Sequence, residues 1–146
     1  MSAAAPALDL SQPISGPAYG RGYRIGASIV MALIVVMIAR RYDELAPLAN
    51  TTIGGFFIAG FVALVASYVL LLKSVTTIDE QGIRQSGLLE KKVAWQDIRY
   101  ARLKGIGSSK RLVISTGFGK FRAFYAGTPA LAQAFRRISA AYAPRG

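Results

Sequence analysis

The sequence predicts an α+β membrane protein in which a two-helix hairpin precedes a small antiparallel β domain that ends in one α-helix. Three observations lead to this fold class. First, 53% of the 146 residues are hydrophobic, and nearly all of the uninterrupted apolar sequence lies within residues 25–72. Second, short runs rich in β-branched and aromatic residues alternate with turn residues from residue 75 onward. Third, one amphipathic helical pattern follows near the C-terminus.

Residues 1–22 precede the first apolar run and contain several proline and glycine turn signals but no apolar periodicity. Chain of this composition buries too little apolar surface to offset the entropy lost on folding. We therefore predict a flexible N-terminal tail. Arg21 and Arg24 lie at its end, and their long side chains can reach lipid headgroups from the start of the first helix.

Residues 23–73 are predicted to form the hairpin, with transmembrane helices at about 24–41 and 52–72. The second apolar run has no charged residue and has the length that a bilayer crossing needs, about 20 residues. The first run is shorter, and tyrosines at the membrane interface can extend it. A cleaved signal peptide is the alternative for this run, but the tail before it is long, and Met37 occupies a position where cleavage prefers a small residue.

Small residues recur at every fourth position of the second helix. Such a stripe lets another helix approach closely in lipid. We predict that it packs the two hairpin helices together, and a homo-oligomer or partner-subunit interface is the alternative. The stripe consists of Gly55, Ala59, Ala63 and Ser67.

Basic residues flank the hairpin unequally, and their excess on one side of a membrane marks the cytoplasmic side. The link between the helices carries only Arg40 and Arg41. We therefore predict an integral membrane protein with both termini in the cytoplasm. The basic residues on the terminal side are Arg21, Arg24, Lys73, Arg84, Lys91 and Lys92.

Residues 74–146 are predicted to fold as the β domain. Thr128 is a suitable N-cap and Pro129 suits the first helical position, so a helix should run over about 129–143. Its apolar residues fall on one stripe that would cover an open end of the sheet. This stripe is Leu131, Phe135, Ile138 and Tyr142. The predicted strands are 75–78, 83–86, 92–95, 98–103, 111–115 and 120–124.

Two short motifs add a family resemblance. Residues 76–83 read TTIDEQGI and residues 93–98 read VAWQDI. With its turn ending in Gly-Ile and its Trp-x-Asp-Ile element, the chain resembles the bacterial PH (pleckstrin-homology-like) domain family, whose members often follow a transmembrane hairpin. The resemblance implies a small antiparallel PH-like β-barrel capped by the C-terminal helix, and a location in the bacterial inner (plasma) membrane.

The residues of these motifs have structural explanations. Gly82 permits the positive φ that closes a tight turn, and Ile83 then points into the sheet interior. Trp95 and Ile98 are predicted core residues. Asp97 is predicted to accept hydrogen bonds from backbone donors at the bend between strands.

The sequence offers little for catalysis. It contains no cysteine and no histidine, which excludes thiolate nucleophiles, imidazole bases and the commonest zinc ligands. Asp79 and Glu80 lie in a predicted turn, where adjacent carboxylates are usually solvated. Residues 105–109 begin like a phosphate-binding loop, but the lysine and hydroxyl residue of that motif do not follow. We predict that the protein is not an enzyme and holds no cofactor or metal.

Charge gives the strongest indication of a partner. Of the 18 basic and 7 acidic residues, 14 and 4 follow Leu72, so this part of the chain has a formal charge of +10. Such a charge attracts an anionic lipid surface, nucleic acid or an acidic protein, and attachment to a membrane favours the lipid surface. The turn at 79–82, by contrast, is short and acidic, unlike the basic loop of PH domains that bind inositol lipids. The predicted contact residues are Lys91, Lys92, Arg99, Arg102, Lys104, Lys110, Arg111, Lys120 and Arg122.

Three functional hypotheses follow. The first is a membrane-anchored adaptor or scaffold whose basic domain binds a partner protein, an anionic lipid surface, or both. The second is a small accessory subunit of a larger membrane complex. The third and least favoured is nucleic-acid binding, in which Tyr100, Phe118 and Phe121 would stack on bases.

Overall fold

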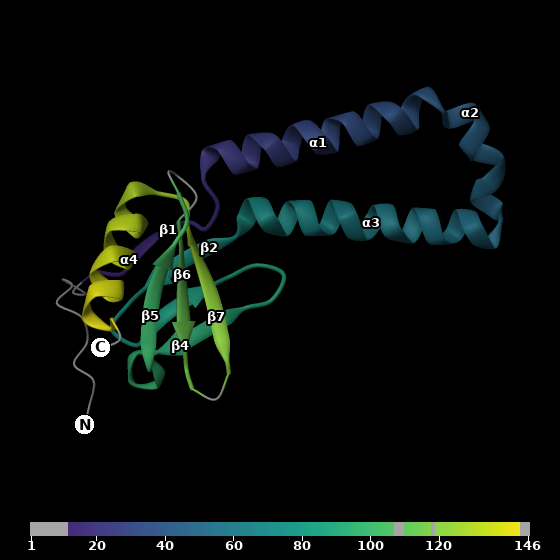
Figure 1. The fold of residues 1–146 in the computed structure, drawn as a ribbon. Coiled ribbons are helices and arrows are strands. Elements are labelled where there is room, and N and C mark those ends of the chain that lie inside the picture. The colour runs from purple at the N-terminus through teal and green to yellow at the C-terminus, as the bar shows by residue number, and fades with distance from the viewer. Residues whose placement is uncertain (1–11, 107–109, 118, 144–146) are drawn as a thin grey trace. The chain divides into compact units, whose positions relative to one another are not determined.

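The computed structural model describes residues 12–106, 110–117 and 119–143, and Figure 1 shows its elements. The chain divides into two compact units. One is residues 21–72, here called the hairpin unit. The other, the β domain, is built from the segments on both sides of the hairpin unit. The β domain is therefore discontinuous in sequence.

The hairpin unit contains two long helices, α1 (Arg21–Arg40) and α3 (Thr52–Lys73), joined by the short helices α2 (Tyr42–Leu45) and η1 (Ala46–Asn50). Both long helices are long and apolar enough to cross a membrane, and most of their large apolar residues are exposed. Their bounds lie close to those predicted from the sequence.

The link between the helices is ordered by hydrogen bonds at its end. The hydroxyl of Thr51 donates to the carbonyl of Leu48 at 2.6 Å and accepts from the amide of Gly54 at 3.1 Å. Thr51 thus ends the link and caps one of the amide groups that the first turn of α3 leaves without a helical partner.

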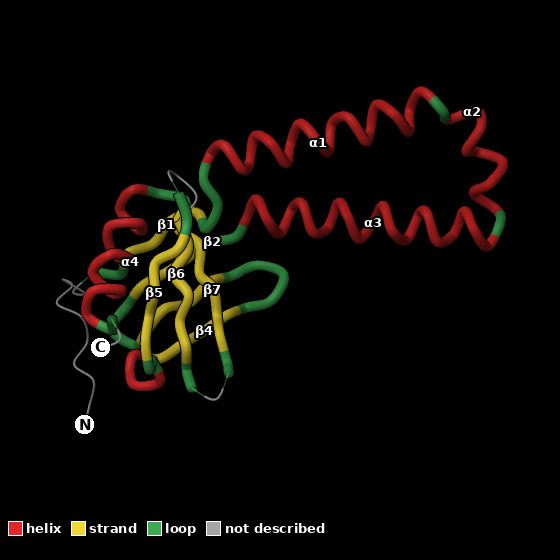
Figure 2. The backbone as a smooth tube through the Cα atoms, viewed as in Figure 1, coloured by secondary structure: helices red, strands yellow, loops and turns green. Residues whose placement is uncertain are grey.

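The β domain contains two antiparallel sheets, drawn in yellow in Figure 2. All six strands predicted from the sequence are present, with ends shifted by a few residues. Sheet A has the order β1 (Ile14–Pro17), β2 (Val75–Ile78), β3 (Gly82–Gln85) and β4 (Lys91–Ala94). Sheet B has the order β5 (Tyr100–Lys104), β6 (Lys110–Ser115) and β7 (Phe121–Ala126). The short helix η2 (Trp95–Asp97) joins the sheets, and α4 (Pro129–Ala141) follows β7.

Strand β1 corrects the prediction of a flexible tail. Residues 1–11 lie outside the described residues, but Ile14 pairs with Ile78 and Pro17 pairs with Val75 in an antiparallel ladder. The amide of Ala18 then donates to the carbonyl of Ser74 at 3.0 Å. The segment is too short and too rich in turn residues for local periodicity to reveal a strand. It forms a strand because β2, about 60 residues further along the chain, supplies partners for its backbone hydrogen bonds.

The prediction of a closed barrel is wrong, because no backbone ladder joins the two sheets among the described residues. Several backbone groups at both edges of sheet B have other hydrogen-bond partners. On β5, the amide of Ala101 donates to the carbonyl of Tyr142, and the amide of Leu103 donates to the hydroxyl of Ser139. On β7, the backbone of Tyr125 is bound by side chains of sheet A. Strand groups that already have partners gain little from closing a ladder.

The contacts at β7 come from one row of sheet A. The hydroxyl of Thr76 donates to the carbonyl of Tyr125 at 2.8 Å, and the amide of Tyr125 donates to Oε1 of Gln85 at 3.0 Å. Thr76 and Gln85 are directly paired across β2 and β3, and both are buried. Two polar side chains thus replace the backbone bonds of a closed barrel.

A Gln85→Leu variant should lower the free energy of unfolding of the β domain by about 1–3 kcal/mol, because the Tyr125 amide loses its acceptor. The measurement is urea unfolding in detergent, followed by the fluorescence of Trp95, the single tryptophan of the sequence. Gln96→Leu makes the same chemical change at an exposed residue and should have little effect. Equal stability of the two variants would contradict the sealing role of Gln85.

The core of the β domain lies between the two sheets and α4. All four residues of the predicted helical stripe are buried, and so are Trp95 and Ile98, as predicted. The hydroxyl of Thr128 accepts from the amide of Leu131 at 3.3 Å, which confirms it as the N-cap of α4. The sheet residues packed in this core include Ile78, Ile83, Leu112, Ile114 and Phe124.

The turn between β2 and β3 depends on Gly82 and Asp79. Gly82 has a φ of 153°, and a Cβ there would lie 2.0 Å from the carbonyl oxygen of Val93. Oδ1 of Asp79 accepts from the amides of Gln81 and Gly82. The role predicted for Asp97 thus belongs to Asp79, since no hydrogen bond links the exposed Asp97 carboxylate to a backbone amide within the described part.

Candidate functional site

The outer face of sheet B is the candidate functional site. Side chains alternate between the two faces of a strand. Ala101, Leu112, Ile114 and Phe124 point into the core, so their neighbours on β5, β6 and β7 point away from it. Helix α4 packs on the inner side, and among the described residues of the β domain no helix covers the outer side.

Three of the predicted contact residues meet on this outer face. Lys104 lies directly opposite Arg111 in the β5–β6 ladder, and Arg102 is the next outward residue on β5. All three are exposed. Like charges directly opposite each other destabilise a sheet. The described ion pairs are Arg41–Glu44 and Arg84–Glu90, so neither Lys104 nor Arg111 is neutralised by a carboxylate there. This arrangement favours an external anion.

An aromatic pair lies at the other end of the same face. Tyr100 and Phe121 both flank Ser115 of β6, and their rings meet edge to face with centroids 6.3 Å apart. Phe121 is 58% exposed. Phe118, the third aromatic residue considered for stacking, lies outside the described residues. The face thus combines an aromatic end with a cationic end.

Lys91, a predicted contact residue, has a structural role instead. Its ammonium donates to the carbonyl of Ala123 on β7 at 3.2 Å and lies 5.9 Å from the ring centroid of Tyr125. Lys91 is paired with Gln85 in sheet A, so it continues the row that seals the β7 edge. The contact of Lys91 with the edge of β7 therefore explains why a basic residue occupies this position, without a partner protein or lipid.

The other five predicted residues do not join the outer face. Lys92 lies opposite Arg84 on sheet A. Lys110 begins β6 opposite Ala126. The remaining three gather near the β6–β7 turn, where the side chain of Arg99 lies beside Gly117. These three are Arg99, Lys120 and Arg122. The sequence alone could not separate these groups, because their positions depend on strand register.

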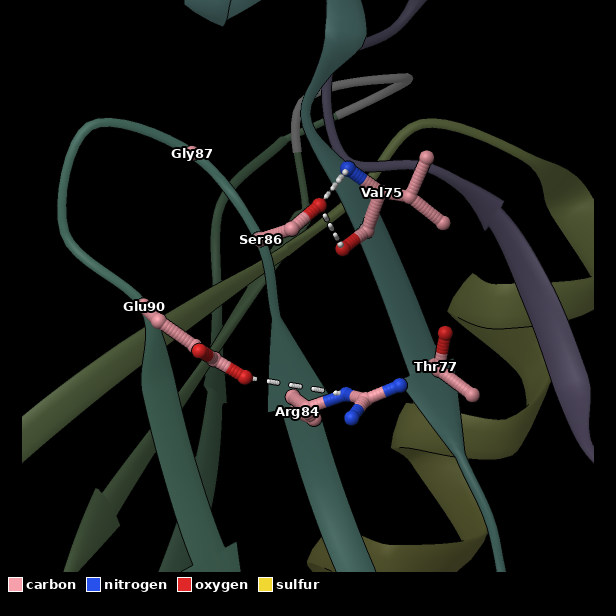
Figure 3. Close-up of a pocket in the computed structure, with 6 residues that line it drawn as sticks. All are labelled: Val75, Thr77, Arg84, Ser86, Gly87 and Glu90. Carbon is pink, nitrogen blue, oxygen red and sulfur yellow. Dashed lines mark hydrogen bonds and ion pairs between the residues drawn. The ribbon is translucent and has the colours of Figure 1, made fainter.

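A pocket of about 320 Å³ opens on sheet A, as Figure 3 shows. Nε of Arg84 lies 3.9 Å from Oε1 of Glu90 at its rim. The hydroxyl of Ser86 is bound to the backbone of Val75, whose amide donates to it at 3.1 Å. The one acid of the pocket is thus paired with an arginine and its serine is committed to the backbone, so the lining holds no nucleophile–base pair.

Tyr142 is the buried titratable group of the core. Burial raises the pKa of its phenol above the ordinary value. Its ring stacks on Trp95 with centroids 6.5 Å apart. Packing therefore explains this tyrosine, and its shifted pKa does not mark a proton-transfer site.

Comparison of the chain with known protein families, curated proteins and solved structures found no match.

The small-residue stripe of α3 is not packed against α1. Gly55, Ala59, Ala63 and Ser67 are all exposed, and a Cβ added to Gly55 would have nothing within 4 Å. The hairpin helices instead meet through the hydroxyls of Ser28 and Tyr68, which lie 2.6 Å apart. The role of the stripe in helix packing therefore stays a prediction.

Proposed function

We propose that the protein is a non-enzymatic, membrane-anchored adaptor, with the two long helices crossing a bilayer and the β domain binding an acidic partner protein. The exposure of the two helices supports the anchor. Phe56 and Phe57 are 76% and 73% exposed, and Met37 is 64% exposed. Water strongly disfavours such an uninterrupted apolar surface, whereas lipid accommodates it. The excess of basic residues on the terminal side supports a cytoplasmic β domain.

The resemblance to the bacterial PH domain family is part of this proposal. Two antiparallel sheets enclosing one core, with a C-terminal helix packed on it, are compatible with a PH-like domain that is sealed by side chains along β7. The bacterial inner membrane is the location that this resemblance implies. The acidic turn containing Asp79 and Glu80 favours a protein partner over an inositol lipid.

The single observation that carries the proposal is the uncompensated cationic group on the outer face of sheet B. Arg102, Lys104 and Arg111 repel one another, and an acidic partner would remove this cost while its apolar surface covered Phe121. Arginine and aromatic residues are also the types that dominate the energetics of protein interfaces.

Site-specific photocrosslinking in intact membranes tests this function. A photoreactive residue at Phe121 should attach a discrete partner, and Arg102→Glu with Arg111→Glu should reduce that product by about tenfold, equivalent to about 1.4 kcal/mol. Arg136→Glu with Arg137→Glu is the matched control, since both residues are exposed on α4. Crosslinking that is absent, or that survives the first charge reversal unchanged, would refute the adaptor proposal.

The exposed stripe of α3 favours a second candidate, an accessory subunit held by its helices. Lipid-facing small residues that no helix of this chain covers are suited to a partner helix or a second copy. Replacing Ala59 and Ala63 by leucine distinguishes the two functions. An accessory subunit would lose co-purification with its complex, whereas the adaptor would retain the Phe121 crosslink.

Nucleic-acid binding remains the third candidate, because Tyr100 and Phe121 share the outer face of sheet B with the cationic group. Electrostatic binding to a polyanion weakens steeply with salt. A filter-binding assay without salt-dependent affinity would exclude it.

A further inference from the structure

The β domain has one end at which its chain leaves for α1 and returns from α3, here called the hairpin end. Ala18 and Ser74 mark it, joined by the hydrogen bond described above. Because successive antiparallel strands run in opposite directions, the connections between them alternate between the two ends of a sheet. The turn at 79–81 therefore lies at the opposite end, and the connection at 86–90 lies at the hairpin end.

The connection between β3 and β4 is tied to the residue that follows α3. The amide of Ser86 donates to the carbonyl of Val75 at 2.9 Å, and the hydroxyl of Ser74 donates to the carbonyl of Ser86. Further along the same connection, Leu88 and Leu89 are 70% and 75% exposed. Leu88 is two residues from Ser86, so it lies within about 7 Å of it.

The connection between β5 and β6 ends close to the segment that leads into α1. Lys110 pairs with Ala126, and the amide of Gly127 donates to the carbonyl of Pro17 at 2.9 Å. Within the described part of this connection, Ile106 is 94% exposed. The rings of Tyr19 and Tyr125 are 5.2 Å apart. Sheet B therefore presents its apolar connection at the same end as sheet A.

Basic residues lie beside Ile106, and the connection that carries Leu88 and Leu89 ends at Glu90, which is paired with Arg84. Lys104 and Arg111 form the last pair of the β5–β6 ladder before the connection that carries Ile106, and Lys110 precedes Arg111. The turn at the opposite end of sheet A instead carries Asp79 and Glu80. Single exposed leucines are common on protein surfaces. Here three large apolar side chains share one end with cations, which is the composition of surfaces that enter the membrane interface.

We propose that the hairpin end of the β domain docks on an anionic lipid surface, with Leu88, Leu89 and Ile106 inserted at the interface. This inference rests on the proposed membrane anchor. If α3 leaves the bilayer at Lys73, the next residue is Ser74, whose hydroxyl donates to the carbonyl of Ser86. The connection that carries Leu88 and Leu89 then starts close to the membrane surface. Lys110 and Arg111 then contact anionic headgroups. The docking would fix the orientation of the β domain on the membrane.

The absence of cysteine makes the test direct, because a single introduced thiol can carry an environment-sensitive fluorophore. The full chain is placed in nanodiscs that contain anionic lipid, with the thiol introduced by Leu89→Cys or Ile106→Cys. Glu80→Cys is the control at the opposite end of sheet A, and Val62→Cys reports on α3. Trp95 emission verifies that each variant is folded.

Docking predicts a blue shift of emission and quenching by lipid-borne nitroxides at positions 89 and 106, but not at position 80. If position 62 is quenched by lipid while positions 89 and 106 behave like position 80, the docking proposal is overturned and the anchor stands. If position 62 is open to aqueous quenchers, the anchor fails, and docking fails with it.

The role of the cations is tested separately. In nanodiscs of zwitterionic lipid alone, or with Lys110→Gln and Arg111→Gln in anionic lipid, the blue shift at position 106 should diminish. A shift that is the same in all three samples would overturn the contribution of the headgroups.

Discussion

A Gly127→Ala variant is expected to release strand β1 and to lower the free energy of unfolding of the β domain by about 3 kcal/mol, the upper end of what overpacking costs. A Cβ at this position would lie 2.3 Å from the carbonyl oxygen of Pro17 and 2.6 Å from the carbonyl carbon of Tyr19. These atoms belong to backbone, which cannot turn aside as a side chain can. The variant should also weaken the hydrogen bond from the Gly127 amide to the carbonyl of Pro17.

Two measurements check this expectation. Urea unfolding followed by Trp95 fluorescence gives the change in stability, and hydrogen exchange should accelerate at the amide of Ala18, which is bound to Ser74. Gly26→Ala is the control, because a Cβ there meets nothing within 4 Å. Unchanged exchange at Ala18 would show that β1 does not depend on this close approach.

A Phe135→Ala variant should cost about 3–5 kcal/mol, the usual loss for a large aromatic residue removed from a core. Phe135 is fully buried on α4 and belongs to the same cluster as Leu112, Ile114 and Phe124 of sheet B. Removal of its ring leaves a cavity where helix and sheets meet. Because α4 also binds the edge of β5 through Ser139 and Tyr142, its loosening would expose that edge as well.

The stability of the Phe135→Ala variant is measured by the same fluorescence-detected unfolding. The hairpin unit contains no tryptophan, so the signal reports on the β domain. Arg136→Ala changes the next residue, which is exposed, and should leave the midpoint nearly unchanged. Equal midpoints for the two variants would mean that α4 contributes little to the core.

Much of the fold was predictable because the relevant signals are local. The helices at Arg21–Arg40 and Thr52–Lys73 follow from apolar runs, and α4 follows from its N-cap and apolar stripe. The predicted core residues Trp95 and Ile98 are buried. Strand β1 was missed because nothing within its four residues distinguishes a strand from a loop.

The candidate site was predicted only in part. Arg102, Lys104 and Arg111 were predicted as contact residues and are exposed, but the sequence could not show that Lys104 faces Arg111. It also could not show that Lys91 binds Ala123, a residue 32 positions away. The predicted contact residues did not include Leu88, Leu89 and Ile106. Large apolar residues within predicted connections are a signal of an exposed apolar surface, and the sequence contained this signal.

The sequence by itself determined the two long apolar helices, the strand positions after residue 75 and the amphipathic C-terminal helix. Each depends on side-chain periodicity within a short segment, which acts before any distant contact forms. Only the tertiary structure decided that β1 completes sheet A, that side chains rather than a ladder seal β7, and that the basic residues divide into separate groups. These features depend on register and on backbone groups far apart in the chain, such as Thr76 and Tyr125, and local patterns carry no information about such pairings.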